Sequence, residues 1–148
     1  FVNPDTQHRR LLNEKAVEIA NKNATKGLEF SISKIITEKS IVNGIIGLLA
    51  TGGSTNHTIH LIAIARAAGI IINWEDMSKL SEVIPLITRM YPNGAADVNH
   101  FHAAGGMPFV INSLLSNGLL HEDVTTILGH GLNHYTQETK IINNTLVV

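Results

Sequence analysis

Two glycine pairs, each ahead of an expected helix, are the residues in this 148-residue chain best suited to bind a ligand. The first pair, Gly52 and Gly53, allows a tight turn and close approach of the backbone to a ligand. A helix beginning near Ser54 would direct free N–H groups and its positive end at that turn. Ser54, Thr55 and Asn56 add neutral hydrogen-bonding groups, so the segment suits a carboxylate or a phosphate. An ordinary turn with Ser54 or Thr55 as helix cap explains the same residues.

The second pair, Gly105 and Gly106, precedes Pro108, which suits the first position of a helix. Two such helix starts would fit a substrate with two anionic ends, although the favoured interpretation is that the glycines and Pro108 only mark the start of a helix. His100 is the best histidine candidate for a functional role, because the segment 99–102 runs directly into this second pair. A purely structural His100 remains an open alternative.

The eight histidines raise the hypothesis of a zinc-dependent enzyme. His57 and His60 are three residues apart on an expected helix, and His130 and His134 are four apart. The His-Glu-x-x-His pattern of zinc proteases is absent, and the sequence has no cysteine nucleophile. We therefore assign no metal ligand and no catalytic residue to this chain. The isolated carboxylate of Asp97 is expected to serve as a helix cap or a solvated charge.

Composition indicates a globular protein with a surface that is normally covered. Apolar residues make up 44% of the chain and charged residues only 16%, against about 25% in typical domains. A net charge of -1 argues against binding to nucleic acid or to an anionic membrane. The chain begins at Phe1 and not at Met, and both ends look cut. We therefore expect residues 1–148 to be a single partial domain, an internal fragment of a larger protein.

The hydrophobic pattern predicts a helix-rich, layered α/β fold with short buried strands and packed helices. Asn3 and Pro4 should begin the first helix, Ser31 and Asn73 should cap later ones, and Gly69 should end the helix before it. The tail, residues 138–148, is expected to be loose. The expected helices are 4–20, 32–36, 41–50 (where a buried strand competes), 58–68, 74–84 and 109–116; the expected strands are 70–72, 86–90 and 124–128.

Several segments together resemble one enzyme family. The segments 48–58, 65–70 and 118–123 are similar to the dihydroxy-acid dehydratase and phosphogluconate dehydratase family. Ile72-Asn73-Trp74, the turn 91–94 and the segment 99–101 resemble its phosphogluconate branch. The resemblance extends from Phe1 to about Gln137, and it is specific as a set.

The resemblance implies part of the N-terminal domain of a cytoplasmic, homodimeric hydro-lyase. That enzyme would dehydrate 6-phospho-D-gluconate to 2-dehydro-3-deoxy-6-phosphogluconate in the Entner–Doudoroff pathway. It also implies an iron–sulfur cluster of the 4Fe-4S type and a divalent cation such as Mg²⁺ in the parent protein. Cluster ligands are cysteine thiolates, and this chain has none. We therefore expect the cluster ligands and the base to lie outside this chain, which alone should be inactive.

In this interpretation Gly53, Ser54, Thr55, Asn56 and His100 line or support the pocket for a small anionic sugar acid. Three alternatives stay open at this point. The chain could belong to a dihydroxy-acid or other sugar-acid dehydratase, it could be a non-catalytic anion-binding module, or it could serve as a structural and interaction unit.

Overall fold

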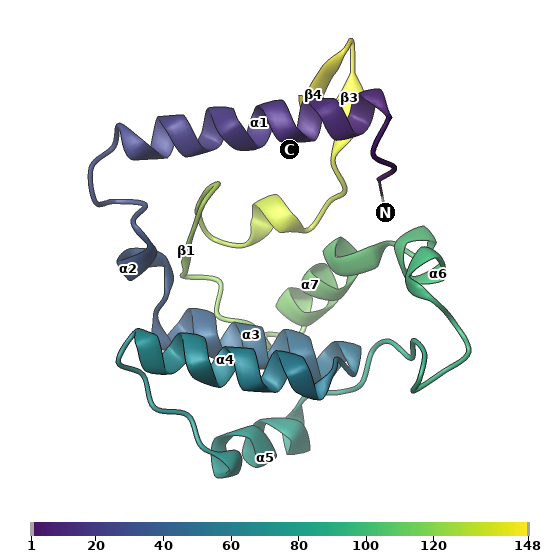
Figure 1. Ribbon diagram of the computed structural model, residues 1–148. Coiled ribbons are helices and arrows are strands. Elements are labelled where there is room, and N and C mark those ends of the chain that lie inside the picture. Colours follow the sequence, from purple (N-terminus) through teal and green to yellow (C-terminus); the bar gives the residue numbers. More distant parts are fainter. Residues whose placement is uncertain (1, 148) are drawn as a thin grey trace.

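A computed structural model describes residues 2–147 and shows a helix-rich fold (Figure 1). The two small sheets are antiparallel hairpins, β1–β2 and β3–β4. No helix within the described residues is both long and apolar enough to cross a membrane. The elements are α1 Gln7–Ala24, α2 Ile32–Ile35, α3 Glu38–Thr51, α4 Thr55–Ala67, α5 Trp74–Val83, α6 Val98–Ala103, α7 Gly106–Ser116, β1 Thr125–Thr126, β2 Gly129–His130, the 3₁₀ turn η1 Asn133–Tyr135, β3 Lys140–Ile142 and β4 Thr145–Val147.

Helix α3 is the central element, and its sequence explains both its start and its burial. Thr37 caps it reciprocally with Ser40: the backbone N–H of each residue donates to the other's hydroxyl. Apolar residues follow on nearly every side, which is typical of a helix covered all around. Gly44 lets α4 approach closely, because a Cβ there would lie 3.1 Å from Cδ2 of Leu61.

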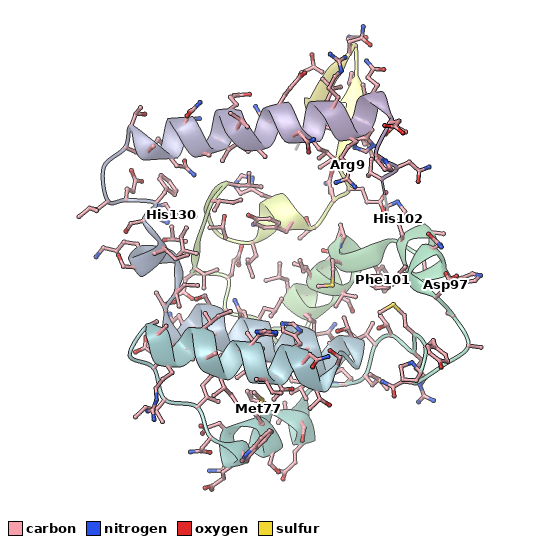
Figure 2. The ribbon with its side chains drawn as sticks, in the orientation of Figure 1. Arg9, Met77, Asp97, Phe101, His102 and His130 are labelled. Carbon is pink, nitrogen blue, oxygen red and sulfur yellow. The ribbon has the colours of Figure 1, made fainter. Side chains whose placement is uncertain are left out.

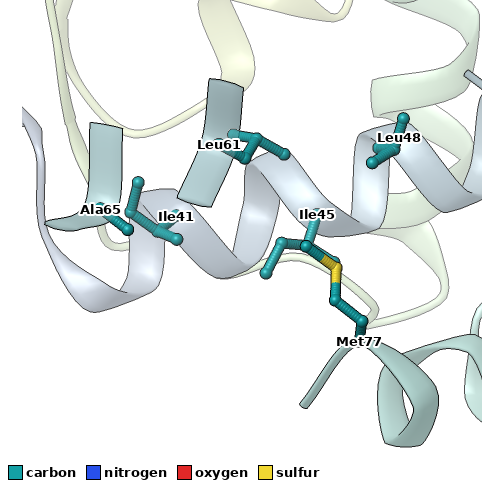
Figure 3. Packing of buried hydrophobic residues seen from close by; sticks show 6 residues of the cluster. All are labelled: Ile41, Ile45, Leu48, Leu61, Ala65 and Met77. Carbon is teal, nitrogen blue, oxygen red and sulfur yellow. The ribbon is translucent and has the colours of Figure 1, made fainter. Parts of the chain in front are cut away.

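Two hydrophobic clusters meet on opposite sides of α3. The first joins α3 to α4 and α5 (Figure 3) and contains Ile41, Ile45, Leu48, Leu61, Ala65 and Met77. The second joins α3 to α7 and to the residue that ends α5, and contains Ile46, Ala50, Ile84, Val110 and Leu114. Burial of these side chains supplies the main driving force for folding.

The segment after α5 closes the carboxyl end of α3. The backbone N–H groups of Ile87 and Thr88 both donate to the carbonyl of Ala50, at 2.7 and 3.2 Å. The Thr88 hydroxyl donates to the carbonyl of Thr51, and the Asn93 side-chain amide donates to that of Gly52. These bonds satisfy carbonyl groups that a helix end leaves without intrahelical partners.

Helix α1 lies apart from this core. It has no buried residue, and in Figure 1 its N-terminal half runs beside the β3–β4 hairpin. Gln7 donates a side-chain hydrogen bond to Asn144, and Leu146 of β4 is buried. The segment expected to be a loose tail therefore contains regular structure, because residues 140–142 pair with residues 145–147 across a turn at Asn143 and Asn144, both with positive φ.

The helix-rich architecture is confirmed, but the expected strands are largely wrong. Residues 70–72 form no strand, residues 86–90 contribute one isolated bridge at Met90, and only Thr125–Thr126 of the third candidate is extended in a pair. The first helix begins after Thr6, not at Pro4, because the Thr6 hydroxyl accepts the Arg9 N–H as its cap. Helix α6 was not anticipated.

Ile45 provides a direct test of the core, because it is 1% exposed at the centre of the first cluster. Ile45→Ala should lower the free energy of unfolding by about 2–4 kcal/mol, through lost burial and a residual cavity. Val17→Ala is a suitable control, since Val17 on α1 is 62% exposed and its truncation should change stability by less than about 0.5 kcal/mol. Urea unfolding followed by circular dichroism measures both; equal effects would contradict this core.

Candidate functional site

The turn between α3 and α4 requires glycine for two different reasons. Gly52 ends α3 in the left-handed conformation, with φ 60° and ψ 40°. The N–H groups of Gly52 and Gly53 donate to the carbonyls of Leu49 and Leu48, at 3.2 and 3.0 Å. At Gly53 a Cβ would lie only 2.6 Å from Cδ1 of Leu48, so a side chain there would displace the core. The structure therefore confirms the predicted tight turn at Gly52 and Gly53.

The first turn of α4 presents hydrogen-bond donors that the fold does not use. Ser54 is the N-cap residue, but its exposed hydroxyl makes no capping bond, unlike the side chains of Thr37 and Asn73. Within residues 2–147 the backbone N–H groups of Thr55 and Asn56 also have no hydrogen-bond acceptor. Both are exposed. A helix N-terminus with free N–H groups and a free hydroxyl can bind an anionic group.

A groove of about 420 Å³ opens beside this turn, between α3, α4 and α5. Gly53 lines it together with Trp74, whose side chain is 69% exposed, and with the hydroxyl-bearing residues Thr58, Ser78 and Ser81. The groove therefore combines an apolar base from α3 with neutral polar groups at its edge. Among the residues that the structure describes, no charged side chain lines it.

His100 lies in a different place from the glycine turn. It lines a separate cavity of about 310 Å³ together with Thr88, Phe101 and Phe109. Its ring nitrogen Nδ1 lies 3.2 Å from the backbone nitrogen of Asp97 and 2.9 Å from the Asp97 carboxylate, as part of the cap of α6. The structure does not bring His100 and Gly53 to one cavity.

Asp97 itself is the N-cap of α6, as expected for an isolated carboxylate. Its Oδ1 accepts the N–H groups of Asn99 and His100, at 2.9 and 3.1 Å. The His100 N–H is the main cause that lowers the pKa of the Asp97 carboxyl below its ordinary value of 3.8, with further contributions from the Asn99 N–H and the His100 ring. Ionised Asp97 therefore stabilises the folded chain at pH values above 3.8. This stabilisation is lost as the pH falls through the lowered pKa.

A cavity of about 760 Å³, larger than the two described above, was missed by sequence reasoning. It lies between the start of α1, helices α6 and α7, and the segment 134–139, and Gly106, His8, His102 and His134 contribute to its walls. Figure 2 shows His102 on the side of α6 that faces the N-terminal segment, where its Nδ1 is 3.8 Å from a Glu138 oxygen. Its lining residues come from three regions of the sequence, 2–8, 98–111 and 128–139, so no single local motif indicates it.

The histidine pairs are not assembled with further ligands. In the described part of the chain, no three His, Asp or Glu side chains lie close enough to hold one metal ion. His130, at the edge of the β1–β2 hairpin, instead lies 3.7 Å from Glu29 and packs near the ring of Phe30 (Figure 2). The zinc hypothesis gains no support from this arrangement.

Comparison with known proteins decides the family. The N-terminal domain described as "Dihydroxy-acid/6-phosphogluconate dehydratase N-terminal" matches residues 1–135. The chain belongs to this dehydratase family. It is 54% identical to the phosphogluconate dehydratase of Rhizobium meliloti over 145 residues and 55% identical to that of Escherichia coli K12 over 147, covering 97% and 99% of this chain. A dihydroxy-acid dehydratase of Nostoc is 45% identical over 65% of it.

The match covers only part of the relatives. This dehydratase-family chain spans about a quarter of the length of the curated phosphogluconate dehydratases it matches, 24% in both. Both glycine turns and His100 fall inside the matched family domain. The family thus places the candidate residues within a known domain, while their individual roles remain a prediction.

The Ser54 hydroxyl, which makes no capping hydrogen bond, can be tested by its effect on stability. Ser54→Ala should change the free energy of unfolding by less than about 0.5 kcal/mol, because this hydroxyl makes no capping bond. Thr37→Ala is the matched control: its hydroxyl accepts the Ser40 N–H, and its loss should cost about 1 kcal/mol. Thermal or urea unfolding measures both, and a Ser54→Ala loss as large as that of Thr37→Ala would show that Ser54 is an ordinary cap.

Proposed function

We propose that this chain is part of a phosphogluconate dehydratase, a hydro-lyase that converts 6-phospho-D-gluconate to 2-dehydro-3-deoxy-6-phosphogluconate in the Entner–Doudoroff pathway. The supporting observation is the extent of the similarity. Relatives named phosphogluconate dehydratase match 93% to 99% of the chain at 49% to 56% identity, whereas the dihydroxy-acid dehydratase matches 65%. The family resemblance further implies a cytoplasmic homodimer, which we include in the proposal.

The proposed role of these residues is to bind one anionic end of the sugar acid. The free N–H groups of Thr55 and Asn56 and the Ser54 hydroxyl converge at one helix N-terminus, where negative charge is favourable. Gly53 keeps the turn tight enough for a ligand to reach the backbone. Since no charged side chain of residues 2–147 lines the adjacent groove, the groups of this chain that would favour the ligand's charge are backbone N–H dipoles and a hydroxyl. His100 is proposed to line a neighbouring part of the pocket in the complete protein.

The iron–sulfur cluster implied by the family does not fit the residues of this chain. Such clusters are held by cysteine thiolates, and the chain contains no cysteine. The described residues also bring no three carboxylate or imidazole groups together. We therefore assign no step of water elimination to this chain and propose that its part is to bind and orient the substrate.

A chimeric enzyme tests this function. In it, the matching segment of the complete Escherichia coli phosphogluconate dehydratase is replaced by this chain. The chimera should dehydrate 6-phosphogluconate in preference to a branched-chain dihydroxy acid, whereas the isolated chain should show no turnover. The 2-keto acid product is quantified directly. A folded chimera that prefers the dihydroxy acid, or turnover by the isolated chain, would contradict the proposal.

The role of the first turn of α4 is tested in the same chimera. Ser54→Ala should raise the KM for 6-phosphogluconate by about 10-fold or more, because a hydrogen bond to a charged group is lost. Thr37→Ala, which removes a hydroxyl that caps α3, should leave KM unchanged. Unchanged KM in Ser54→Ala, with the fold intact, would remove Ser54 from the substrate pocket.

A further inference from the structure

The cavity of about 310 Å³ that His100 lines also has an arginine in its wall, and neither the sequence motifs nor the fold assigns this arginine a role. Among the described residues that line the cavity, Arg89 is the only one with a permanent charge. It is exposed and takes part in no ion pair or side-chain hydrogen bond within residues 2–147, whereas Arg10 pairs with Glu14. Arg89 therefore offers a ligand a positive charge and several N–H donors.

The backbone around Arg89 is held in place on both sides. Before it, the Thr88 N–H donates to the carbonyl of Ala50 at the end of α3, at 3.2 Å. After it, the Gly94 N–H donates to the Met90 carbonyl at 3.0 Å, and a Cβ at Gly94 would collide with the Arg89 carbonyl oxygen. A fixed backbone at this position reduces the conformational entropy that is lost when the arginine binds a ligand.

His100 can supply a second donor to the same cavity. Asp97 engages its Nδ1, while its Nε2 has no hydrogen-bond partner among residues 2–147. When Nδ1 accepts the Asp97 backbone N–H, the proton of the neutral ring is on Nε2, which then donates. Asp97 does not line the cavity, and its carboxylate already accepts the N–H groups of Asn99 and His100.

The remaining wall of the cavity brings no opposing charge. Within the described chain, no Asp or Glu lines it, and Phe109 and Phe101, which Figure 2 shows between α6 and α7, form apolar parts of the wall. Gly106, the first residue of α7, also lines it, and no side chain caps this helix start. The positive end of the helix dipole thus adds to the effect of Arg89. These features together favour an anion.

We propose that the cavity lined by Arg89 and His100 binds the phosphate group of the sugar-acid substrate, an inference that rests on the proposed function. A planar guanidinium suits a phosphate, because its N–H groups can bind two phosphate oxygens at once. The first turn of α4, beside a groove that no charged side chain of residues 2–147 lines, would then take the carboxylate at the other end of the molecule.

The two places are linked by one residue. Thr88 lines the cavity, and its hydroxyl donates to the Thr51 carbonyl, directly before the glycine turn. Two separate cavities on the two sides of this contact suit a ligand with one anionic group at each end. Arg89 is therefore the residue that distinguishes a sugar-acid phosphate from an acid with a single anionic group.

Titration of the isolated chain with inorganic phosphate, at constant ionic strength and followed by NMR, tests the site without turnover. The amide signals of Arg89, His100 and Gly106 should shift saturably. Arg89→Gln should raise the Kd for phosphate by about 10-fold or more, because hydrogen bonds to a charged group are lost. Arg66→Gln is the matched control, since Arg66 is an exposed arginine on α4 that does not line the cavity, and its Kd should be unchanged.

Three results of this titration would overturn the proposal. The first is no saturable shift with phosphate. The second is an equal effect of the two arginine substitutions, which would show a response to net charge alone. The third is binding of acetate as tight as that of phosphate, because the cavity would then suit a carboxylate equally well.

The chimeric enzyme shows whether the same arginine reads the substrate. Arg89→Gln should raise the KM for 6-phosphogluconate by about 10-fold or more and leave competitive inhibition by gluconate, which has no phosphate, unchanged. An unchanged KM, or an equal loss of gluconate binding, would overturn the proposal. A folded chimera without activity on 6-phosphogluconate would count against the proposed function alone, because the phosphate titration decides the cavity separately.

Discussion

The burial of α3 is the constraint on which the rest of this structure depends. A helix with apolar residues on nearly every side must be covered all around, and two clusters on opposite sides achieve this. Helices α4 and α5 cover one side, and α7 with Ile84 covers the other. Because α4 packs directly on α3 and follows it after three residues, the position of α3 also fixes where the first turn of α4 lies. The core thereby positions the candidate site.

The two helix ends that meet at Gly52 and Gly53 differ in how their backbone groups are hydrogen-bonded. The carbonyl end of α3 is satisfied by the backbone and side chains of the segment 87–93. The N–H end of α4 is left open, with an unused hydroxyl at Ser54. The carbonyl groups at the turn are therefore engaged in hydrogen bonds while N–H groups stay free, which favours an anionic ligand over a cationic one. Under the proposed function, substrate binding and water elimination would be divided between segments of one larger protein, because this chain has no cysteine to hold the cluster.

Much of the helical structure could be predicted from the sequence, because caps and glycines act locally. Asn73 caps α5 and Gly69 follows α4 as expected, since both effects depend only on neighbouring residues. The strands could not be predicted, because a short β-branched run packs equally well without pairing: Ile70 and Ile72 bury part of their surface against the first cluster as irregular chain. Within the candidate site, the Gly53–Asn56 turn was predictable from its glycines. The separation of His100 from that turn was not, because it depends on the path of the segment 84–97 around α3.

Native-state hydrogen exchange of the isolated chain, resolved by residue, tests the central role of α3 most directly. If α3 organises the fold, the amides of its buried middle, from Ile45 to Leu49, should exchange most slowly, at least about 100-fold more slowly than those in the middle of α1, which has no buried residue. Exchange in α3 as fast as in α1 would contradict the account, because the helix that holds both clusters together would then open without the rest of the structure.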